Sequence, residues 1–508
     1  MITYHAQAAV HLPEGVSQVD VLAEESLPRA WISRWQDDPA QAVAVMPNGT
    51  AISAAELEER SAAVAGRFER AGLQPGDRIV ISAGASIELL VAYVAAHRLG
   101  LVTVPMNTGY SAGEIRHIVR NTAPRAAVVD DAERGRLIGA ASTGPMIVTG
   151  INVNIPDGPP SRLDQSTRDT PALICHTSGT TGAPKGAVLT SGNLLASAEA
   201  VRIAWRWNPD DCLVLALPLF HMHGLGIGVN GTLVSGATAL LLPKFRTRAV
   251  AEAIDRDRAT LFFGVPTMYH RLAADDRLVA LRRLRLCVSG SAPLAPGLFE
   301  QIYQASGQLV LERYGLTETV ITVSNPYEGV RKPGMVGLPL PNVELRLAES
   351  PTGAGEIQLR GPSVFPGYHG NSQATAEVFT PDGWFRTGDL GEFDQDGYLR
   401  IVGRSKELII SGGYNVYPRE VEELLLSHPS VQEVAIVGHP SEEWGEAVVA
   451  YIVCDGPPDR QALMNFAAQR LAAYKRPREI RFVDALPRNA LGKVQRDQLT
   501  RDGRRVAD

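Results

Sequence analysis

Residues 176–186, with the sequence HTSGTTGAPKG, combine the side chains and the backbone freedom that can hold a phosphate group. Glycines leave backbone N–H groups open to an anion, hydroxyl groups donate to phosphate oxygens, and a lysine adds positive charge. The residues that we expect to contact phosphate are Thr177, Ser178, Gly179, Thr180, Thr181, Gly182 and Lys185. The pattern of a Walker A loop, GxxxxGK(S/T), occurs nowhere in the chain. Because the segment follows the apolar run 172–175, it predicts a phosphate loop at the end of a strand.

Two other patterns have the spacing of known binding motifs without their usual setting. Residues 226–231 fit the GxGxxG pattern, but a dinucleotide-binding loop should follow its strand directly, and the run PLFHMHGL intervenes. His221 and His223 have a spacing that would place two metal ligands on one strand face, yet no third ligand is evident in the sequence. GxSxG, the nucleophile elbow of many hydrolases, is absent. We therefore favour none of these three kinds of site.

Alternating strand-like and helix-like patterns predict the framework that positions the phosphate loop. Residues 78–84 form a short apolar strand, residues 87–99 have helical periodicity and end before Gly100, and residues 101–107 form the next strand. This order is a βαβ unit with parallel strands, and similar apolar runs recur to about residue 315. The sequence therefore predicts the α/β class, with doubly wound sheets in a large N-terminal domain.

The pattern changes after about residue 336. Short alternating strands separated by Gly, Pro and Asp predict a β-rich part at 336–403. From residue 404 a mixture of an amphipathic helix, strands and a further helix predicts a small α+β domain. We therefore divide the chain into an N-terminal domain, 1–403, and a C-terminal domain, 404–508.

Composition excludes several classes of function. Among 508 residues, 49 Lys and Arg stand against 55 Asp and Glu, so the net charge of −6 gives no reason to expect a nucleic-acid partner. The four cysteines are far apart, which disfavours a disulfide framework and a zinc site and favours a reducing, cytoplasmic location. No secretory signal is visible at the N-terminus. The uncharged segment 212–243 is interrupted by Pro, His and Gly, so we expect buried strands and turns there and no membrane span.

Six further motifs follow in a fixed order: LPLFH at 217–221, SGSAP at 289–293, YGLTET at 314–319, TGD at 387–389, GRSKE at 403–407 and PRNALGK at 487–493. Together with HTSGTTGAPKG they closely resemble the adenylate-forming superfamily of acyl-CoA synthetases, luciferases and peptide-synthetase adenylation domains. The resemblance implies a large α/β domain hinged to a small, mobile C-terminal lid. It also implies an AMP-forming acid–CoA ligase, with Mg²⁺ as cofactor and ATP and CoA as co-substrates. In this reaction a carboxylate attacks the α-phosphate of ATP, so positioning and charge stabilisation dominate catalysis.

The resemblance assigns roles to residues around the nucleotide. Tyr314 would stack on adenine, in a pocket completed by Ser291, Ala292 and Pro293, and Gly315 would also contact ATP. Thr317 would donate to the α-phosphate, and Glu318 would bind the magnesium ion, which prefers carboxylate and phosphate oxygens. Asp389 would accept the ribose hydroxyls, and Arg404 would also reach the ribose.

The same resemblance assigns roles in the C-terminal domain. Lys493 would neutralise charge during adenylation, and rotation at the hinge residue Lys406 would withdraw it and bring in Gly412, Gly413 and Tyr414 for CoA. Between 470 and 505 eleven Lys and Arg stand against four acids. This basic end either meets the phosphates of CoA or is a solvated face.

Within the superfamily the chain looks closest to malonyl-CoA synthetases, so malonate or a similar small dicarboxylate is the expected substrate. Arg271 matches the arginine that would hold its second carboxylate, with Arg285 as a possible second cation, while His221 and Ser289 would border the acid. The chain departs from that pattern at 320–323, where VITV replaces the expected Met-Asn-Thr. A short-chain or aryl monoacid, or another oxyanion such as nitrite, therefore stays open as substrate, as does a carrier-protein thiol as acceptor. A non-catalytic nucleotide sensor is a further alternative, disfavoured by intact Glu318 and Lys493. We expect a monomer or homodimer.

Overall fold

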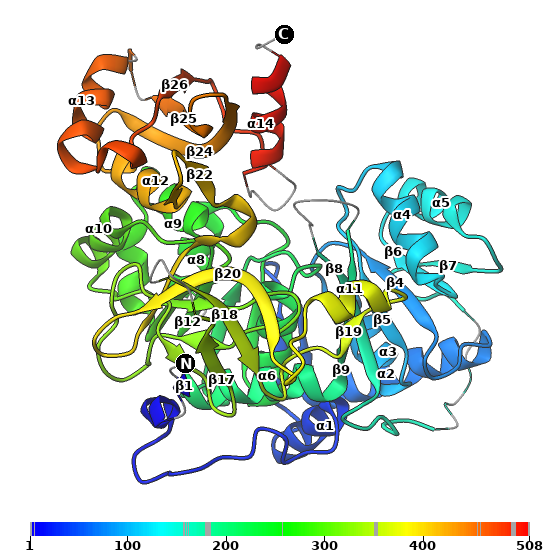
Figure 1. Cartoon of the computed structure of the whole chain (residues 1–508). Helices are drawn as coiled ribbons and strands as arrows, with labels where there is room; N and C mark the ends of the chain where they lie inside the picture. Colours follow the sequence, from blue (N-terminus) through cyan, green and yellow to red (C-terminus); the bar gives the residue numbers. More distant parts are fainter. Residues whose placement is uncertain are drawn as a thin grey trace. The chain divides into compact units, whose positions relative to one another are not determined.

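The computed structural model describes residues 3–4, 6–155, 158, 160, 162–177, 184–256, 258–349, 354–454, 456–457, 459–488 and 494–505. These residues divide into two compact units, which we treat separately (Figure 1). The larger unit comprises Tyr4–Leu345 and Leu359–Phe385, and the smaller unit comprises Met1–Thr3, Arg346–Gln358 and Arg386–Asp508. The predicted site residues Ser178, Gly179, Thr180, Thr181, Gly182 and Lys493 lie outside the described residues.

The larger unit contains two sheets whose central strands run parallel. The seven-stranded sheet has the order β19-β9-β8-β5-β4-β6-β7, and the nine-stranded sheet has the order β16-β15-β14-β13-β12-β10-β11-β2-β3. The strands of the first are β4 (Arg78–Ser82), β5 (Val102–Pro105), β6 (Ala126–Val129), β7 (Ile147–Gly150), β8 (Pro171–His176), β9 (Gly186–Thr190) and β19 (Gly367–Tyr368). Those of the second are β2 (Ala42–Val45), β3 (Ala51–Ser53), β10 (Cys212–Leu215), β11 (Thr238–Leu241), β12 (Leu261–Gly264), β13 (Leu286–Ser289), β14 (Leu311–Tyr314), β15 (Val323–Ser324) and β16 (Leu338–Pro339).

Helices pack against both sheets and confirm the predicted α/β class. Short sequence signals start several of them: Ser53 caps α2 in a reciprocal pair with Glu56, and Ser86 caps α3. Figure 1 shows α4 and α5 beside β6 and β7. The helices are α1 (Leu27–Asp37), α2 (Ala54–Arg70), α3 (Ile87–Arg98), α4 (Ala112–Thr122), α5 (Ala132–Ala141), α6 (Ser191–Ala204), α7 (Asn230–Ser235), α8 (Thr247–Arg256), α9 (Pro266–Ala274), α10 (Pro296–Ser306) and α11 (Ser372–Glu377), with shorter turns at η1 (Ala6–His11), η2 (His223–Val229) and η3 (Leu278–Arg283).

The uncharged segment 212–243 is buried, as predicted, but it is partly helical. After β10 the chain forms η2, a π-helical turn, and α7 before it enters β11. Small residues permit this path: a Cβ on Gly224 would lie 2.4 Å from the Pro218 carbonyl oxygen, and one on Gly226 would lie 2.2 Å from the Met222 methyl group. The prediction of strands and turns was therefore incomplete, because glycine spacing signals close packing as well as turns. Among the described residues no helix is both long and apolar enough for a membrane crossing.

Two further sheets belong wholly or mostly to the smaller unit. One has the order β1-β17-β18-β20-β21, and the other has β23-β22-β25-β24, with β26 beside β25. Their strands are β1 (Thr3–Tyr4), β17 (Glu344–Leu347), β18 (Gly355–Arg360), β20 (Phe385–Phe393), β21 (Leu399–Arg404), β22 (Ile409–Ser411), β23 (Tyr414–Val416), β24 (Val431–Ser441), β25 (Gly445–Cys454) and β26 (Glu479–Phe482); the helices are α12 (Pro418–Leu426), α13 (Arg460–Arg470) and α14 (Arg496–Arg505), with turns at η4 (Ser405–Glu407) and η5 (Ala473–Lys475). The division into units groups 386–403 with the residues that follow, and a domain boundary at 403/404 stays a prediction.

Candidate functional site

The two ends of the predicted phosphate loop are held together at the mouth of a hairpin. β8 and β9 pair antiparallel, and the backbone N–H of Thr177 donates to the carbonyl of Lys185 over 2.9 Å. Gly186 is required at the base, because a Cβ there would lie 2.8 Å from a methyl group of Ile174. The strand before the loop is thus confirmed. The inner loop residues lie outside the described part of the chain.

Tyr368 links the lysine of this loop to the predicted metal-binding carboxylate. Its hydroxyl donates to Oε1 of Glu318 over 2.8 Å, and the ammonium group of Lys185 lies 5.2 Å from the centre of its ring. Glu318 is 8% exposed. Burial, followed by the charge of Glu318, raises the pKa of Tyr368, so the hydroxyl stays protonated and donates. Our sequence reasoning missed Tyr368, because a tyrosine in a two-residue strand carries no distinguishing pattern.

Tyr314 ends β14, and Thr317 and Glu318 follow it in one tight loop. The backbone N–H of Thr322 donates to the Tyr314 carbonyl over 3.1 Å and closes the loop. Val320 has a φ of 58°, which is rare for a β-branched residue, and a Cβ on Gly315 would lie 1.9 Å from the Val320 carbonyl oxygen. Such strain is typical of functional loops. The structure therefore gives the loop one defined shape that presents these side chains together.

The neighbouring strand β13 ends at the same edge of the sheet. β13 and β14 run parallel, so Ser289 and the residues after it lie beside the 314–322 loop. Ser291 also has a positive φ, 69°, whereas Ala292 and Pro293 are exposed. The predicted adenine-pocket residues are thus brought together with Tyr314 at the carboxyl ends of two parallel strands.

A buried polar group lies on the face of the nine-stranded sheet that contains Phe263. Paired residues of parallel strands share a face, and the register aligns Phe263 with Val288 and Val288 with Leu311. Arg313, two residues further along β14, is on the same face. The His223 ring stacks on Phe263 at 6.4 Å. Burial, followed by the charge of Arg313, lowers the pKa of His223 well below its usual value, so the imidazole is neutral.

This group is unusual because four of its buried side-chain nitrogens have no hydrogen-bond partner among the described residues. Nε and Nη2 of Arg313 and both ring nitrogens of His223 are buried without a hydrogen bond among the described residues. We had considered His223 for metal binding and had not singled out Arg313. An arginine near the end of the predicted strand 308–315 was the signal that could have identified it. Among the described residues no cluster of three or more His, Cys, Asp or Glu could hold a metal ion.

His221 stands just before η2, half-buried, and its Nδ1 accepts from the backbone N–H of His223 over 3.3 Å. It is therefore near the group formed by His223 and Phe263, in keeping with a place beside the acid.

The two arginines expected to hold a second carboxylate have different surroundings, and the role of Arg271 stays a prediction. Arg271 is exposed on α9, with its guanidinium 5.1 Å from the centre of the Phe245 ring. Arg285 precedes β13, at the strand end opposite to Ser289, where its Nε donates to Asp211 over 2.7 Å. It also donates to two backbone carbonyls. The structure thus corrects the expectation for Arg285, whose donors are already used by this ion pair.

The predicted ribose-binding pair belongs to the smaller unit and is well ordered by its strands. Asp389 and Arg404 are register partners in the β20–β21 pair, and Arg404 Nε lies 3.0 Å from Asp389 Oδ1. Asp389 is 4% exposed, and its backbone N–H donates to the Thr387 hydroxyl. Gly388 between them has a φ of 72°, a conformation that glycine adopts without strain.

The predicted hinge and CoA-binding residues follow β21. Lys406 is exposed in η4. Gly412 and Gly413 form the turn between β22 and β23 with φ of 58° and 81°, and a Cβ on Gly413 would meet nothing within 4 Å. Tyr414 is 58% exposed and stacks on Tyr474 at 4.7 Å. An open glycine turn beside an exposed ring fits the approach of a narrow chain.

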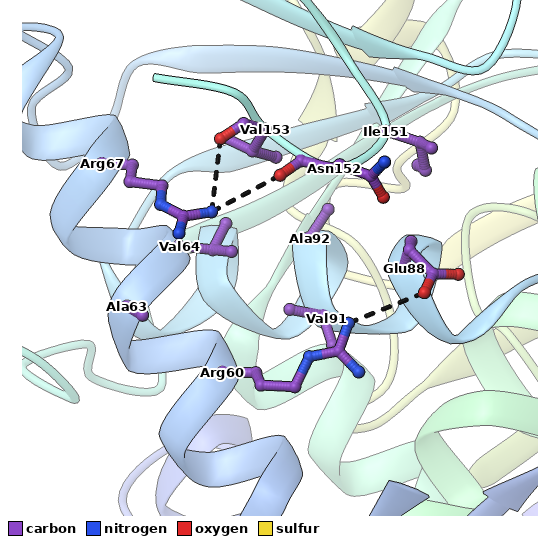
Figure 2. A pocket seen from close by; sticks show the side chains of 10 residues that line it. All are labelled: Arg60, Ala63, Val64, Arg67, Glu88, Val91, Ala92, Ile151, Asn152 and Val153. Atoms are coloured by element: carbon purple, nitrogen blue, oxygen red, sulfur yellow. Dashed lines mark hydrogen bonds and ion pairs between the residues drawn. The ribbon is translucent and has the colours of Figure 1, made fainter. Parts of the chain in front are cut away.

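Figure 2 shows a pocket whose lining includes none of these residues. It is lined by α2, α3 and residues 151–153, with a volume of about 180 Å³. Arg60 lies 3.6 Å from Glu88 across it, and Arg67 donates to the carbonyl of Val153 over 3.4 Å. Its volume is below the ~300 Å³ that small-molecule sites usually offer, and its cations are already paired. We assign it no function.

Comparison with known proteins agrees with these features. The family model described as AMP-binding enzyme matches residues 30–369, and the one described as AMP-binding enzyme C-terminal domain matches residues 420–493. A feruloyl-CoA synthase of Amycolatopsis sp is 35% identical, over 93% of this chain and 98% of the relative. A malonate–CoA ligase of Arabidopsis thaliana is 34% identical, over 85% of this chain and 79% of the relative. The crystal structure of ATP-bound MatB from Rhodopseudomonas palustris matches with a TM-score of 0.89 and 36% identity, covering 95% of this chain and 100% of that one.

Proposed function

The chain belongs to the AMP-binding enzyme family of ATP-dependent, AMP-forming acid–CoA ligases, and from this premise we propose that it activates malonate or a similar small dicarboxylate. In the proposed reaction one carboxylate attacks the α-phosphate of ATP and pyrophosphate leaves. The thiolate of CoA then attacks the acyl-adenylate, and AMP leaves. Relatives of similar identity bear the names of different acids, so identity alone does not choose the substrate.

The observation that supports a small acid as substrate is a cluster of aromatic side chains packed beside His223. Phe263 meets Trp205 edge-on at 5.3 Å and Trp207 at 5.2 Å, and all three side chains are fully buried. A Cβ on Gly231 would lie 2.3 Å from the Trp207 ring, so these rings are closely packed. Since bulky side chains occupy this face of the sheet, we infer that the acid beside it is short.

The residues of the larger unit fit a magnesium nucleotide. Glu318 supplies a buried carboxylate whose orientation Tyr368 fixes, and Mg²⁺ prefers one or two such oxygens together with phosphates. We propose that Glu318 would hold the ion, which neutralises charge on the phosphates. Thr317 would donate to the α-phosphate, and Lys185 would counter the charge of the leaving pyrophosphate. Tyr314 would stack on adenine.

In the smaller unit Asp389 and Arg404 would bind the ribose, because a buried carboxylate fixed by an arginine is a ready acceptor for two hydroxyls. The turn at Gly412 and Gly413, which is open at Gly413, would guide the pantetheine chain of CoA. Lys493 would act in the adenylation step alone. We further propose a lid domain at 404–508 that turns at Lys406.

Acid-dependent exchange of labelled pyrophosphate into ATP tests the function. We expect exchange with malonate to exceed that with butyrate and ferulate, and AMP to form on adding CoA. Glu318→Gln should reduce exchange at least a hundredfold, because an amide binds Mg²⁺ far more weakly. Formation of ADP in place of AMP would refute the adenylate, and a preference for ferulate would refute the substrate class.

A further inference from the structure

Helix α4 contacts both arms of the β8–β9 hairpin that carries the predicted phosphate loop. His117 and Asn121 are four residues apart on α4, so their side chains lie on the same face of the helix. Nε2 of His117 lies 2.8 Å from the carbonyl oxygen of Pro184, just before β9. Nε2 of His176, at the end of β8, lies 3.1 Å from Oδ1 of Asn121. One turn of α4 therefore holds each arm of the hairpin by one side chain.

The hydrogen bond between His117 and Pro184 has a fixed direction. A carbonyl oxygen can only accept, so Nε2 of the imidazole carries the hydrogen and donates it. Proline has a fixed φ and no N–H, so its carbonyl is the one backbone polar group that Pro184 offers to a neighbour. The contact is therefore a directed one, from a side chain of α4 to the backbone of the loop arm.

The oxygen that His117 holds belongs to the peptide bond before Lys185. A peptide group is planar, so a hydrogen bond to this oxygen orients the plane that ends at the Cα atom of Lys185. The carbonyl on the other side of that Cα accepts from the backbone N–H of Thr177 over 2.9 Å. Both peptide planes that flank Lys185 are thus held, the second by backbone and the first by the His117 side chain.

The strand on the other side of β9 supports the same short segment. β19 pairs with β9, and the backbone N–H of His369 donates to the carbonyl of Gly186 over 2.8 Å. The Tyr368 ring lies 5.2 Å from the ammonium group of Lys185, and its hydroxyl donates to Glu318. The backbone before the lysine is therefore fixed from α4, and its ammonium group is placed from β19.

The packing leaves little room for the hairpin to shift against α4. A Cβ on Gly186 would lie 3.2 Å from Oδ1 of Asn121 and 3.3 Å from Nε2 of His176. These contacts do not involve His117. Removal of the His117 imidazole would therefore release the peptide plane before Lys185 while the base of the hairpin stayed in place.

We propose that His117 is a positioning residue for the adenylation step: it orients the peptide bond before Lys185 and so directs the ammonium group toward the phosphates of ATP. This inference rests on the proposed function, in which Lys185 counters the charge of the leaving pyrophosphate. His117 acts through Lys185 and does not itself contact the nucleotide. A displacement of about 1 Å in a group that acts on the reacting phosphates can cost about a hundredfold in rate, so small changes in this backbone matter.

The substitutions His117→Leu and Arg116→Leu test the proposal as a matched pair on α4, because Arg116 is exposed. Pyrophosphate exchange is measured with whichever of malonate, butyrate and ferulate the wild type uses best. His117→Leu should raise the KM for pyrophosphate about tenfold, since the lost hydrogen bond misplaces Lys185. The KM for the acid should change less than about twofold, and Arg116→Leu should behave as the wild type. An unchanged KM for pyrophosphate in His117→Leu, or an equal rise in the KM for the acid, would overturn the proposal.

A double substitution shows whether His117 acts through Lys185. Lys185→Met alone should raise the KM for pyrophosphate at least as much as His117→Leu does. When His117→Leu is added to Lys185→Met, this KM should change less than about twofold, because the side chain that His117 positions is already gone. Effects that multiply in the double variant would mean that His117 acts by another route.

Two further variants separate positioning from folding. His117→Gln places an amide N–H close to the position of Nε2 and should bring the KM for pyrophosphate to within about threefold of the wild type. Asn121→Leu leaves Nε2 of His176 without that partner, so it should lower the Tm and leave the KM for pyrophosphate unchanged. No rescue by glutamine, or a rise in KM in Asn121→Leu as large as in His117→Leu, would refute the role of His117.

The same assay distinguishes failure of the proposed function from failure of this role. If the wild type shows no acid-dependent exchange with any of the three acids, the proposed function fails, and the role of His117 fails with it. If the wild type exchanges and His117→Leu keeps the wild-type KM for pyrophosphate, only the role of His117 fails.

Discussion

Arg285 directly precedes β13 and Arg313 lies in the neighbouring parallel strand β14, but the surroundings of the two arginines differ. Arg285 stands at the amino end of β13, where it donates to Asp211 over 2.7 Å and to the carbonyls of Trp205 and Arg206 over 3.0 and 3.1 Å. Arg313 stands near the carboxyl end of β14, where its Nε and Nη2 have no partner among the described residues. At the amino end of these strands the arginine is paired within the protein. At the carboxyl end, buried nitrogens of the arginine have no hydrogen-bond partner among the described residues. Unsatisfied groups are expected where a ligand completes them.

The largest expected difference between the two arginines is in their contribution to the free energy of unfolding. Arg285→Met leaves the carboxylate of Asp211, 3% exposed, without its cation, so we expect the free energy of unfolding to fall by about 3–5 kcal/mol. Arg313→Met should cost nothing. Urea denaturation followed by tryptophan fluorescence measures both, because Trp205 and Trp207 are buried in the same unit. Equal losses in the two variants would break the distinction.

A smaller effect is expected for the hydrogen-bonded pair formed by Tyr368 and Glu318. Tyr368→Phe removes the hydroxyl that donates to Glu318, and a hydrogen bond to a charged group is worth about 1.5–3 kcal/mol. We expect kcat to fall ten- to a hundredfold, with a higher Mg²⁺ concentration needed for half-maximal exchange. Tyr303→Phe on the exposed face of α10 is the control and should behave as wild type. A normal Mg²⁺ dependence in Tyr368→Phe would show that the hydroxyl does not position Glu318.

Buried histidines make the free energy of unfolding depend on pH. Burial lowers the pKa of His97 to about 3 and that of His11 to about 4, against about 6.5 in the unfolded chain. Between pH 6.5 and 4 the unfolded chain therefore binds protons that the folded rings do not, so stability falls as the pH falls. Each ring contributes about 1.4 kcal/mol per pH unit.

Urea denaturation at pH 6 and pH 5 measures this slope. His97→Gln should flatten it by about 1.4 kcal/mol per pH unit, and His270→Gln, at an exposed position, should leave it unchanged. If His97→Gln had the wild-type slope, the ring would be titrating as it does in water.

Local signals were sufficient for much of the fold. The alternation of apolar runs and capped helices predicted β4, α3 and β5 within a residue or two, and the parallel sheets that follow from them. The motifs that contain Glu318 and Asp389 were located through the family resemblance, because their residues are contiguous in sequence. In 212–243 the prediction of strands and turns missed η2 and α7, since close packing around glycines is a tertiary effect.

Partners distant in sequence could not be predicted in this way. Asp211 pairs with Arg285 across 74 positions, and Tyr368 meets Glu318 across 50. Both pairs exist because strands far apart in the chain are neighbours in space. From the sequence Arg285 therefore looked available for a ligand, whereas Arg313 looked like one more residue of a strand. Pairing, rather than residue type, separates these two arginines.

The smallest expected effect concerns Arg271, which resembles neither member of the pair. Its guanidinium is exposed over the Phe245 ring, a contact worth about 0.5–1 kcal/mol. Arg271→Met should lower the free energy of unfolding by no more than that, because water already solvates the charge and the methionine can cover the same ring. Urea denaturation measures this loss, and the loss in Arg285→Met, measured in the same way, provides the scale. A loss as large as that of Arg285→Met would mean that exposure is a poor guide to an arginine's role in this fold, and the contrast between the two ends of the sheet would lose its basis.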